Sequence, residues 1–305
     1  MKKNDAVPSG LILFRKLPGL TSFDALRDIK RALGTGKVGH TGTLDKFAEG
    51  LLLILTGRAL KLSRWFTHCD KQYKGVICFG AETETLDPEG AVIAQAPLPS
   101  RESVEGMLSQ FRGNIEQAPP AYSAIHIDGK RASALARSGA AVEMQKRPVT
   151  IYRLELVSWD PPFAKIDVHC SGGTYIRSLA RDIALAAGSR GHLVSLLRTK
   201  VGGFELTKEQ RTEKNEEREM RNGELEIRNI DKDVFDKLGI SWVDISRQDA
   251  ARVAQGKSLI QTSFGEELTL REKKTATALF CEDRLIAVIE RQNNQWHYGC
   301  VYAGN

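Results

Sequence analysis

Several features that often reveal a protein's class are missing from this sequence. No apolar run approaches the roughly 18 residues that cross a bilayer, so a membrane-spanning helix is not expected. The first residues contain no apolar signal region, and the five scattered cysteines show no C-x-x-C spacing, which is typical of reduced thiols. We therefore expect a cytoplasmic protein without structural disulfides.

The motifs of common cofactor sites are missing as well. The chain has no G-x-G-x-x-G after a strand, no G-x-x-x-x-G-K-[ST] and no G-x-S-x-G. None of its six histidines pairs with another His or Cys at a spacing typical of zinc sites. We expect neither a metal nor an organic cofactor, which leaves an enzyme that works with its own side chains or a binding protein.

Positive charge is concentrated in the first two thirds of the chain. Residues 1–207 contain 28 Lys and Arg against 20 Asp and Glu, whereas residues 208–305 contain 16 against 18. A basic surface attracts polyanions because their counterions are released on binding. A surplus of this size is only mildly unusual, however, so charge alone leaves both nucleic-acid binding and an ordinary surface open.

The pattern of apolar residues and turns predicts a mixed α+β chain. A buried block is expected at 51–55, and strands at 11–14, 73–79, 91–94, 149–159 and 163–170. A turn at 87–90 predicts that 91–94 returns antiparallel to 73–79 as a hairpin. Helices are expected at 23–33, 102–111 and 175–187, the first behind a capping box at Thr21–Asp24 and the last behind an N-cap at Thr174. Phe23, Leu26, Ile29 and Leu33 share one face of the first helix. Hairpins outnumber βαβ units, which favours a mixed, largely antiparallel central sheet flanked by helices.

A charged stretch divides the chain into two parts. Residues 208–233 interleave seven basic and nine acidic residues and predict a solvated helix or linker. Beyond it, a short helix capped at Ser246–Asp249 and strands at 276–281, 285–290 and 296–302 predict a small β-rich module that can fold alone. We therefore expect one domain over 1–207 and a second over 234–305.

Three segments carry residues suited to chemistry. The run Gly39–Asp45 places one carboxylate among glycines, hydroxyls and a histidine, although Asp45 could equally be a turn residue. Lys71 and Tyr73 put a cation beside an aromatic ring, which suits phosphate contact and base stacking or simply a surface strand. Arg177 in the first turn of a helix opposes the helix dipole, so we expect it to have an acidic partner.

In this order, the segments resemble the TruB-type family of bacterial tRNA pseudouridine-55 synthases. The family motifs G-H-T-G-T-L-D-P-x-A-x-G, K-x-Y, G-T-Y-I-R and L-R-R-T match 39–50, 71–73, 173–177 and 196–199, and P-P-x-Y-S-A matches 119–124. The resemblance covers about residues 10–207. The C-terminal part resembles a PUA-type RNA-binding barrel in size, position and strand pattern.

The resemblance implies an isomerase that converts uridine 55 in the T-arm loop of tRNA to pseudouridine without a cofactor. Asp45 would be the catalytic carboxylate, acting at the ribose by attack on C1′ or by removal of the C2′ proton. Tyr73 would stack on the flipped uracil and help to remove the C5 proton, and Arg177 would pair with the aspartate. Further substrate or RNA contacts are expected from His40, Lys16, Tyr175 and Leu196, and from the cations Lys71 and Arg198.

Alternatives remain open at this level. A tRNA-binding or folding chaperone without chemistry, or a synthase for another uridine or RNA, fits the same composition. The chain departs from the family pattern at Lys46, Glu49, Glu84, His126 and Leu197, of which Lys46 replaces the proline after the aspartate. These departures bear on RNA affinity more than on chemistry. The family is generally monomeric, so we expect a monomer.

Overall fold

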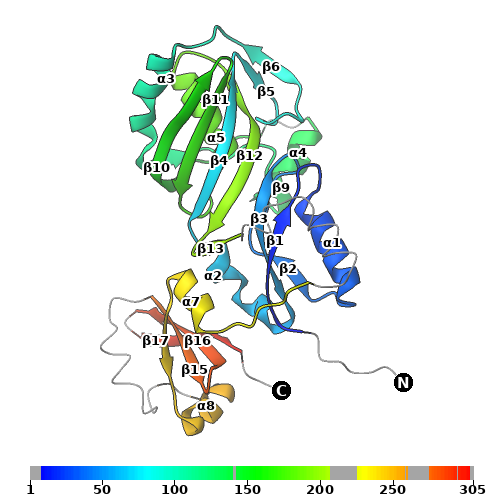
Figure 1. Cartoon of the computed structure of the whole chain (residues 1–305), viewed down its shortest axis with the longest axis vertical. Coiled ribbons are helices and arrows are strands. Elements are labelled where there is room, and N and C mark those ends of the chain that lie inside the picture. Colours follow the sequence, from blue (N-terminus) through cyan, green and yellow to red (C-terminus); the bar gives the residue numbers. More distant parts are fainter. Residues whose placement is uncertain are drawn as a thin grey trace.

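Two sheets dominate the structure. The computed structural model describes residues 8–139, 142–206, 225–257, 259, 275–293 and 295–302. Figure 1 shows a large sheet with its helices above a small C-terminal sheet along the long axis of the molecule. No helix in the described part of the chain is both long and apolar enough to cross a membrane.

The large sheet has nine strands and is antiparallel at every pairing except one. Its path runs through β1 (Gly10–Lys16), β3 (Glu49–Thr56), β12 (Gly191–Val201), β4 (Lys71–Phe79), β11 (Phe163–Cys170), β10 (Arg147–Asp160) and β7 (Gly113–Gln117). Off this path lie β2 (Val38–His40) on β3 and β13 (Phe204–Glu205) on β12. Only β12 and β3 run parallel, so the predicted mixed, largely antiparallel sheet is confirmed.

Helices and short ladders surround this sheet. The described N-terminal helices are α1 (Ser22–Ala32), η1 (Gly57–Leu62), α2 (Ser63–Thr67), α3 (Arg101–Leu108), η2 (Ser109–Phe111), α4 (Ala132–Arg137) and α5 (Ile176–Ala186). Two small ladders join β5 (Ala81–Thr83) to β6 (Val92–Gln95) and β8 (His126–Ile127) to β9 (Lys130–Arg131). The segment 91–94 therefore returns antiparallel as predicted, but its partner is β5 rather than β4.

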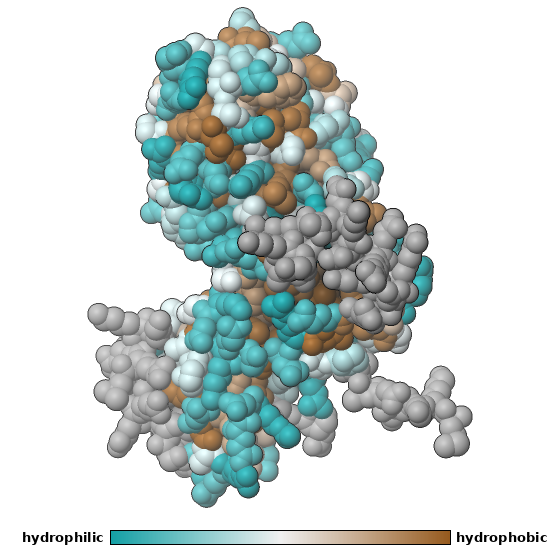
Figure 2. All heavy atoms as spheres, in the orientation of Figure 1, coloured by the Kyte–Doolittle hydropathy of each residue, from teal (hydrophilic) through white to brown (hydrophobic). Residues whose placement is uncertain are grey.

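The helices α3 and α5 cover one face of the large sheet over β4, β11 and β10. Along β4, every second residue is buried, and Tyr73, Ile77 and Phe79 belong to the core that also contains α5, while Gln72, Lys74, Val76 and Cys78 are more exposed. This alternation is typical of an antiparallel sheet with one solvated face. Figure 2 shows apolar side chains among polar ones over the upper strands, where Val157 and Phe163 are exposed. Tyr73 is thus directed to the helix-covered side.

The apolar block at 51–55 is buried on both faces of β3. Leu51, Leu53 and Leu55 belong to one core cluster, whereas Leu52 and Ile54 belong to another beneath α1. A strand that is covered on both sides reads as a continuous apolar run, as the sequence does here. The prediction that this block is buried is confirmed.

The C-terminal part forms a four-stranded sheet in the order β14 (Ser241–Asp244), β15 (Ala276–Cys281), β16 (Arg284–Gln292) and β17 (Gln295–Val301). The three predicted strands are confirmed, and β14 adds a parallel partner to β15 that the sequence pattern did not indicate. The helices α7 (Lys232–Leu238) and α8 (Arg247–Ala254) accompany the sheet. Ser246 caps α8 by accepting a hydrogen bond from the Asp249 N–H, as predicted.

This small sheet shares its core with the large one. Phe66 and Phe204, which come from the N-terminal part, occupy the same cluster as Phe235 on α7 and Phe280 on β15. Residues 208–224 of the predicted charged linker lie outside the described residues. Leu225 and Ile227 pack against the core cluster beneath α1, and Arg228 exchanges two backbone hydrogen bonds with Leu11. The C-terminal module is therefore joined to the rest by a continuous apolar interior.

Two local predictions about helices are wrong. Phe23 is 68% exposed, because the buried stripe of α1 runs through Ala25, Leu26 and Ile29, and Phe23 lies beside it. The capping box at Thr21 is confirmed. The N-cap of α5 is Tyr175 rather than Thr174, whose hydroxyl instead donates to the Ser171 carbonyl.

The shared core predicts the effect of Phe235→Ala. Phe235 is fully buried, and its ring meets that of Phe280 edge to face. The truncation should lower the free energy of unfolding by about 3–5 kcal/mol. Urea unfolding followed by tryptophan fluorescence and by circular dichroism should show one common transition at lower urea. Phe23→Ala is the matched control, since an exposed truncation costs less than about 0.5 kcal/mol. A first transition that leaves the N-terminal part folded would contradict the shared core.

Candidate active site

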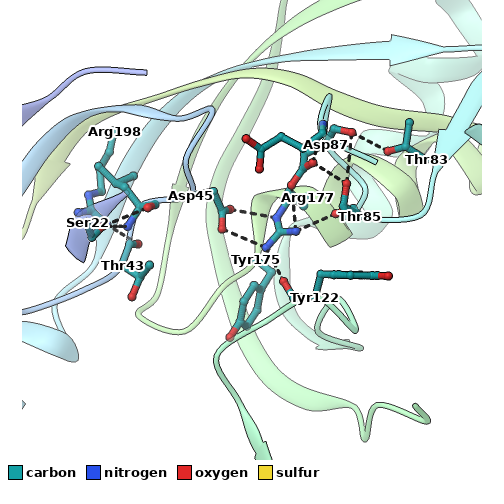
Figure 3. Close-up of polar contacts among 12 residues, drawn as sticks. Ser22, Thr43, Asp45, Thr83, Thr85, Asp87, Tyr122, Tyr175, Arg177 and Arg198 are labelled. Atoms are coloured by element: carbon teal, nitrogen blue, oxygen red, sulfur yellow. Dashed lines mark hydrogen bonds and ion pairs between the residues drawn. The ribbon is translucent and has the colours of Figure 1, made fainter. Parts of the chain in front are cut away.

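The loop that carries Asp45 joins β2 to β3, and side chains from other segments hold it through hydrogen bonds to its backbone. The Arg198 guanidinium donates to the carbonyls of Gly42, Thr43 and Leu51, at 3.1, 3.4 and 2.7 Å. On the other side, the Ser22 hydroxyl donates a hydrogen bond to the Leu44 carbonyl and accepts one from the Leu44 N–H, each at 3.0 Å. Figure 3 shows these contacts converging on the loop just before Asp45.

A buried lysine holds the far side of the same loop. The Lys16 side chain is fully buried, and its ammonium donates to the carbonyls of Lys46 and Ala48, at 3.3 and 2.6 Å. It also donates to the carbonyls of Leu17 and Leu20. Burial lowers the pKa of Lys16 to about 8, with Asp45 acting in the opposite direction. Lys16 lies behind the loop and not on the wall of the cavity described below, so it contacts the site through the backbone.

The Asp45 carboxylate pairs with the guanidinium of Arg177 from the first turn of α5. The Nε atom lies 3.0 Å from Oδ2, and Nη2 donates to Oδ1 at 3.1 Å. Arg177 is only 4% exposed, and its remaining hydrogens go to the Thr85 carbonyl, the Tyr122 carbonyl and the Asp87 carboxylate, at 2.7, 3.0 and 3.2 Å (Figure 3). The predicted acidic partner of Arg177 is present, together with a second one.

The second carboxylate, Asp87, was missed by the sequence reasoning as a site residue. It is buried and accepts hydrogen bonds from the Thr85 hydroxyl at 2.5 Å and the Glu89 N–H at 3.0 Å besides its ion pair with Arg177. Its only signal in the sequence was the motif T-x-T-x-D at 83–87. The turn at 87–90 was correctly predicted, but a turn aspartate commonly satisfies its own backbone, which concealed this role.

Opposing effects act on the ionisation of Asp45. Removal from water raises the pKa of the Asp45 carboxyl above its ordinary value and is the largest effect, the Arg177 guanidinium lowers it, and the nearby Asp87 raises it again. The side chain is still 36% exposed, so it is reachable from the cavity. In this ion pair, the Asp45 carboxylate is accessible from the cavity, whereas the Arg177 guanidinium is buried.

A cavity of about 270 Å³ opens beside this pair. Of the predicted site residues it is lined by Asp45, Lys71, Tyr73, Tyr175, Arg177, Leu196 and Arg198. The structure thus brings together seven side chains from four separate segments of the chain. His40 and Lys16 do not line it. The described residues contain no group of three or more His, Cys, Asp and Glu that could hold a metal ion.

Tyr73 and Lys71 are both buried at the cavity wall. Burial raises the pKa of Tyr73 to about 12, so its hydroxyl is a neutral phenol at physiological pH. The Lys71 ammonium donates to the carbonyls of Thr67 and Cys69, at 2.7 and 2.6 Å, and burial lowers the pKa of Lys71 to about 8. Two of the three ammonium hydrogens of Lys71 are thus used by the backbone, and its predicted contact with a phosphate stays a prediction.

His40 lies on β2, where its ring is half-buried. Among the described residues, its Nδ1 atom is buried without a hydrogen-bond partner. Burial lowers the pKa of His40, and Arg198 lowers it further, so the neutral ring is favoured. Its predicted contact with RNA stays a prediction.

Three of the five departures from the family pattern, Lys46, Glu49 and Glu84, have polar partners of their own. The Lys46 Nζ atom lies 3.4 Å from a carboxylate oxygen of Glu89, and a carboxylate oxygen of Glu49 lies 3.2 Å from Nη2 of Arg15. The Glu84 carboxylate accepts a hydrogen bond from the Tyr122 hydroxyl at 2.5 Å. The first pair links the Asp45 loop to the turn that carries Asp87. Both of its side chains are about half exposed, so the contact contributes at most about 1 kcal/mol.

The chain is similar to known proteins in sequence and in fold. Residues 30–176 match the family model for the TruB family pseudouridylate synthase N-terminal domain. The tRNA pseudouridine synthase B of Borreliella burgdorferi (strain ZS7) is 45% identical over 201 residues, which cover 65% of this chain and 71% of that protein. The enzyme of the same name from Francisella tularensis subsp. novicida is 40% identical over 252 residues, which cover 82% of this chain and 83% of the relative.

Solved structures share the fold. A chain in the crystal structure of a Cbf5–Nop10–Gar1 complex aligns with a TM-score of 0.66 over 97% of this chain and 85% of that chain, at 21% identity. At such low identity the likeness concerns the architecture alone. The sequence relatives carry the assignment, and the chain belongs to the TruB family of pseudouridylate synthases.

Proposed function

We propose that the protein converts uridine 55 in the T-arm loop of tRNA to pseudouridine, without a cofactor. The observation that carries this proposal is the single carboxylate of Asp45, paired with a buried guanidinium and exposed to a cavity with an aromatic wall. The names of the sequence relatives support tRNA as the substrate. A uridine inside a folded loop must leave its stack to reach such a carboxylate, and the enzyme provides the space for it.

One carboxylate is enough for this reaction because no water molecule is activated. The N-glycosidic bond from C1′ to N1 breaks, the uracil turns, C5 bonds to C1′, and the C5 proton is lost while N1 gains a proton. Asp45 would act at the ribose, by attack on C1′ followed by release or by removal of the C2′ proton and its return. A glycosidase would instead use two carboxyl groups to activate or replace water. The second carboxylate here, Asp87, is buried behind Arg177.

The cavity wall supplies stacking and orientation. The ring of Tyr73 offers a face to the uracil, and Leu196 offers an apolar surface. The pKa of about 12 argues against a resident phenolate, so we propose that the Tyr73 hydroxyl takes part in moving the C5 proton as a neutral group. Tyr175, beside the ion pair, would bound the same base (Figure 3).

The C-terminal sheet would extend the contact with tRNA. We propose that residues 234–305 form a PUA-like RNA-binding domain beside a catalytic domain over 1–207, and that the protein acts as a monomer. Support comes from the four-stranded sheet at the expected place in the chain. The shared core would hold this domain in one orientation relative to the cavity.

Asp45→Asn tests the proposal directly. With unmodified tRNA that carries tritium at uridine C5, the intact enzyme should release label. The variant should be at least roughly 1,000-fold slower, as expected when a group acting in the chemical step is removed. Asp160→Asn, at an exposed strand end, is the matched control. A tRNA with cytidine at position 55 should release no label.

The other outcomes of this test would each favour a different function. Full release by Asp45→Asn would contradict the role of this carboxylate. Binding of tRNA without release by the intact protein would favour a folding chaperone. Release from the tRNA with cytidine 55 would point to another uridine.

The pH dependence of activity should report the ion pair. The reaction needs ionised Asp45, and Arg177 lowers the pKa of this carboxyl. Arg177→Gln removes the lowering effect, so Asp45 stays protonated to a higher pH, and the acid limb of the residual single-turnover rate should move up by about 1–3 pH units. Arg181→Gln, on the same helix but paired with Asp182, should leave the limb in place. An unmoved or lower limb in Arg177→Gln would contradict the pairing.

Tyr73→Phe separates stacking from proton transfer. The ring is kept, so tRNA affinity should change little, whereas loss of the hydroxyl should slow single-turnover tritium release by about 10²–10⁴-fold. Tyr152→Phe, on an exposed part of β10, serves as the control. If Tyr73→Phe keeps the full rate, the hydroxyl has no part in moving the proton.

A further inference from the structure

The start of α5 has no side-chain cap of its own. The N-cap residue, Tyr175, makes no side-chain hydrogen bond to the first turn, and the preceding Gly173 has a φ of +86° that few other residues adopt. Arg177 follows as the second helical residue. The direction of its guanidinium therefore depends on how this corner of the backbone is held.

A glutamine from the edge of the sheet holds this corner. Gln117, the last residue of β7, is 2% exposed. Its Oε1 accepts a hydrogen bond from the Tyr175 N–H at 2.8 Å, and its Nε2 donates to the Tyr175 carbonyl at 3.1 Å. The same carbonyl also accepts the Leu179 N–H within α5. One amide thus binds both backbone groups of the residue at which the helix begins.

The segment after Gln117 then follows the first turns of α5. The Ala118 carbonyl accepts from Arg181 at 3.4 Å, and the Tyr122 carbonyl accepts from Arg177 at 3.0 Å. Gln117 is itself anchored by the pairing of β7 with β10, opposite Arg147. It is the point at which the rigid sheet meets both the helix start and the segment that covers the guanidinium.

We infer that Gln117 is a positioning residue, whose amide fixes the start of α5 and thereby directs Arg177 at Asp45 and Tyr175 at the cavity. Only a side chain with an acceptor and a donor at this reach can hold both backbone groups. Methionine has a similar length but makes no comparable hydrogen bond. An ionised glutamate can accept from the Tyr175 N–H, but it places a second oxygen against the Tyr175 carbonyl. A protonated glutamic acid can both donate and accept, as the amide does.

This inference rests on the proposed function for its kinetic test, and a second measurement is independent of activity. Gln117→Met and Gln117→Glu are compared with Gln110→Glu, an exposed matched control. Single-turnover tritium release is followed from pH 5.5 to 8.5. Because small misplacement of a reacting group costs about 100-fold, both variants should be about 10- to 100-fold slower at pH 8, with kcat reduced and KM little changed. As the pH falls, the rate of Gln117→Glu relative to that of Gln117→Met should rise, because protonation of the glutamate restores a donor to the Tyr175 carbonyl.

Hydrogen exchange of the free protein decides the structural part. The peptide spanning 172–180 should exchange faster in Gln117→Met, while the peptides of β4 and β11 keep their protection. Unchanged exchange at 172–180, or rates equal to the intact enzyme in both variants, would overturn the inference. A pH-independent ratio of the Gln117→Glu rate to the Gln117→Met rate would also overturn it, because simple packing would then explain the loss. If the intact protein releases no tritium, the proposed function fails, and the exchange measurement still decides whether Gln117 holds the helix.

Discussion

The buried guanidinium of Arg177 is the contact on which the arrangement of the site depends. It joins the Asp45 loop, the turn around Asp87, the Tyr122 segment and the start of α5. A charge with 4% exposure is tolerated only when its partners remain in place. Loss of one partner would leave an uncompensated buried charge, at a cost of about 3–5 kcal/mol. Charge pairing, rather than apolar packing alone, therefore fixes the position of the carboxylate.

The same principle holds the loop before and after Asp45. Lys16 and Arg198 are buried cations that donate to main-chain carbonyls of this loop. Burying them requires those carbonyls to be in place, because an unsatisfied buried cation would be costly. Glycine in the motif lets the backbone of this segment lie close to that of β12. At Gly50, with a φ of +111°, an added Cβ would lie 2.3 Å from the Arg198 carbonyl oxygen. The backbone of the loop is thus shaped around its cations.

Much of this fold could be predicted because the signals are local. Alternation along β4, the apolar run of β3, the capping box at Thr21 and the N-cap at Ser246 each depend on neighbouring residues. The acidic partner of Arg177 could be expected from its place at a helix start. The second partner, Asp87, could not, because the contact spans 90 residues and a turn explains the same aspartate.

The roles of the buried cations were hidden for another reason. Lysine and arginine can meet a phosphate or a carbonyl with the same hydrogens, and only burial distinguishes the two cases. Lys71 and Lys16 are buried and bind carbonyls. The continuous core beneath the C-terminal sheet could not be predicted from the sequence either, since a small β-rich module has the same alternation whether it folds alone or on a neighbour.

A crystal structure of the protein with a T-arm stem-loop would test the central claim most directly. The account predicts that the uridine at position 55 is flipped out of its stack and lies in the cavity between Asp45 and Tyr73. Its C1′ and C2′ atoms should face the carboxylate, with the Asp45–Arg177 pair intact. A stem-loop bound with all of its bases stacked and this cavity empty, or with a different nucleotide in it, would contradict the account.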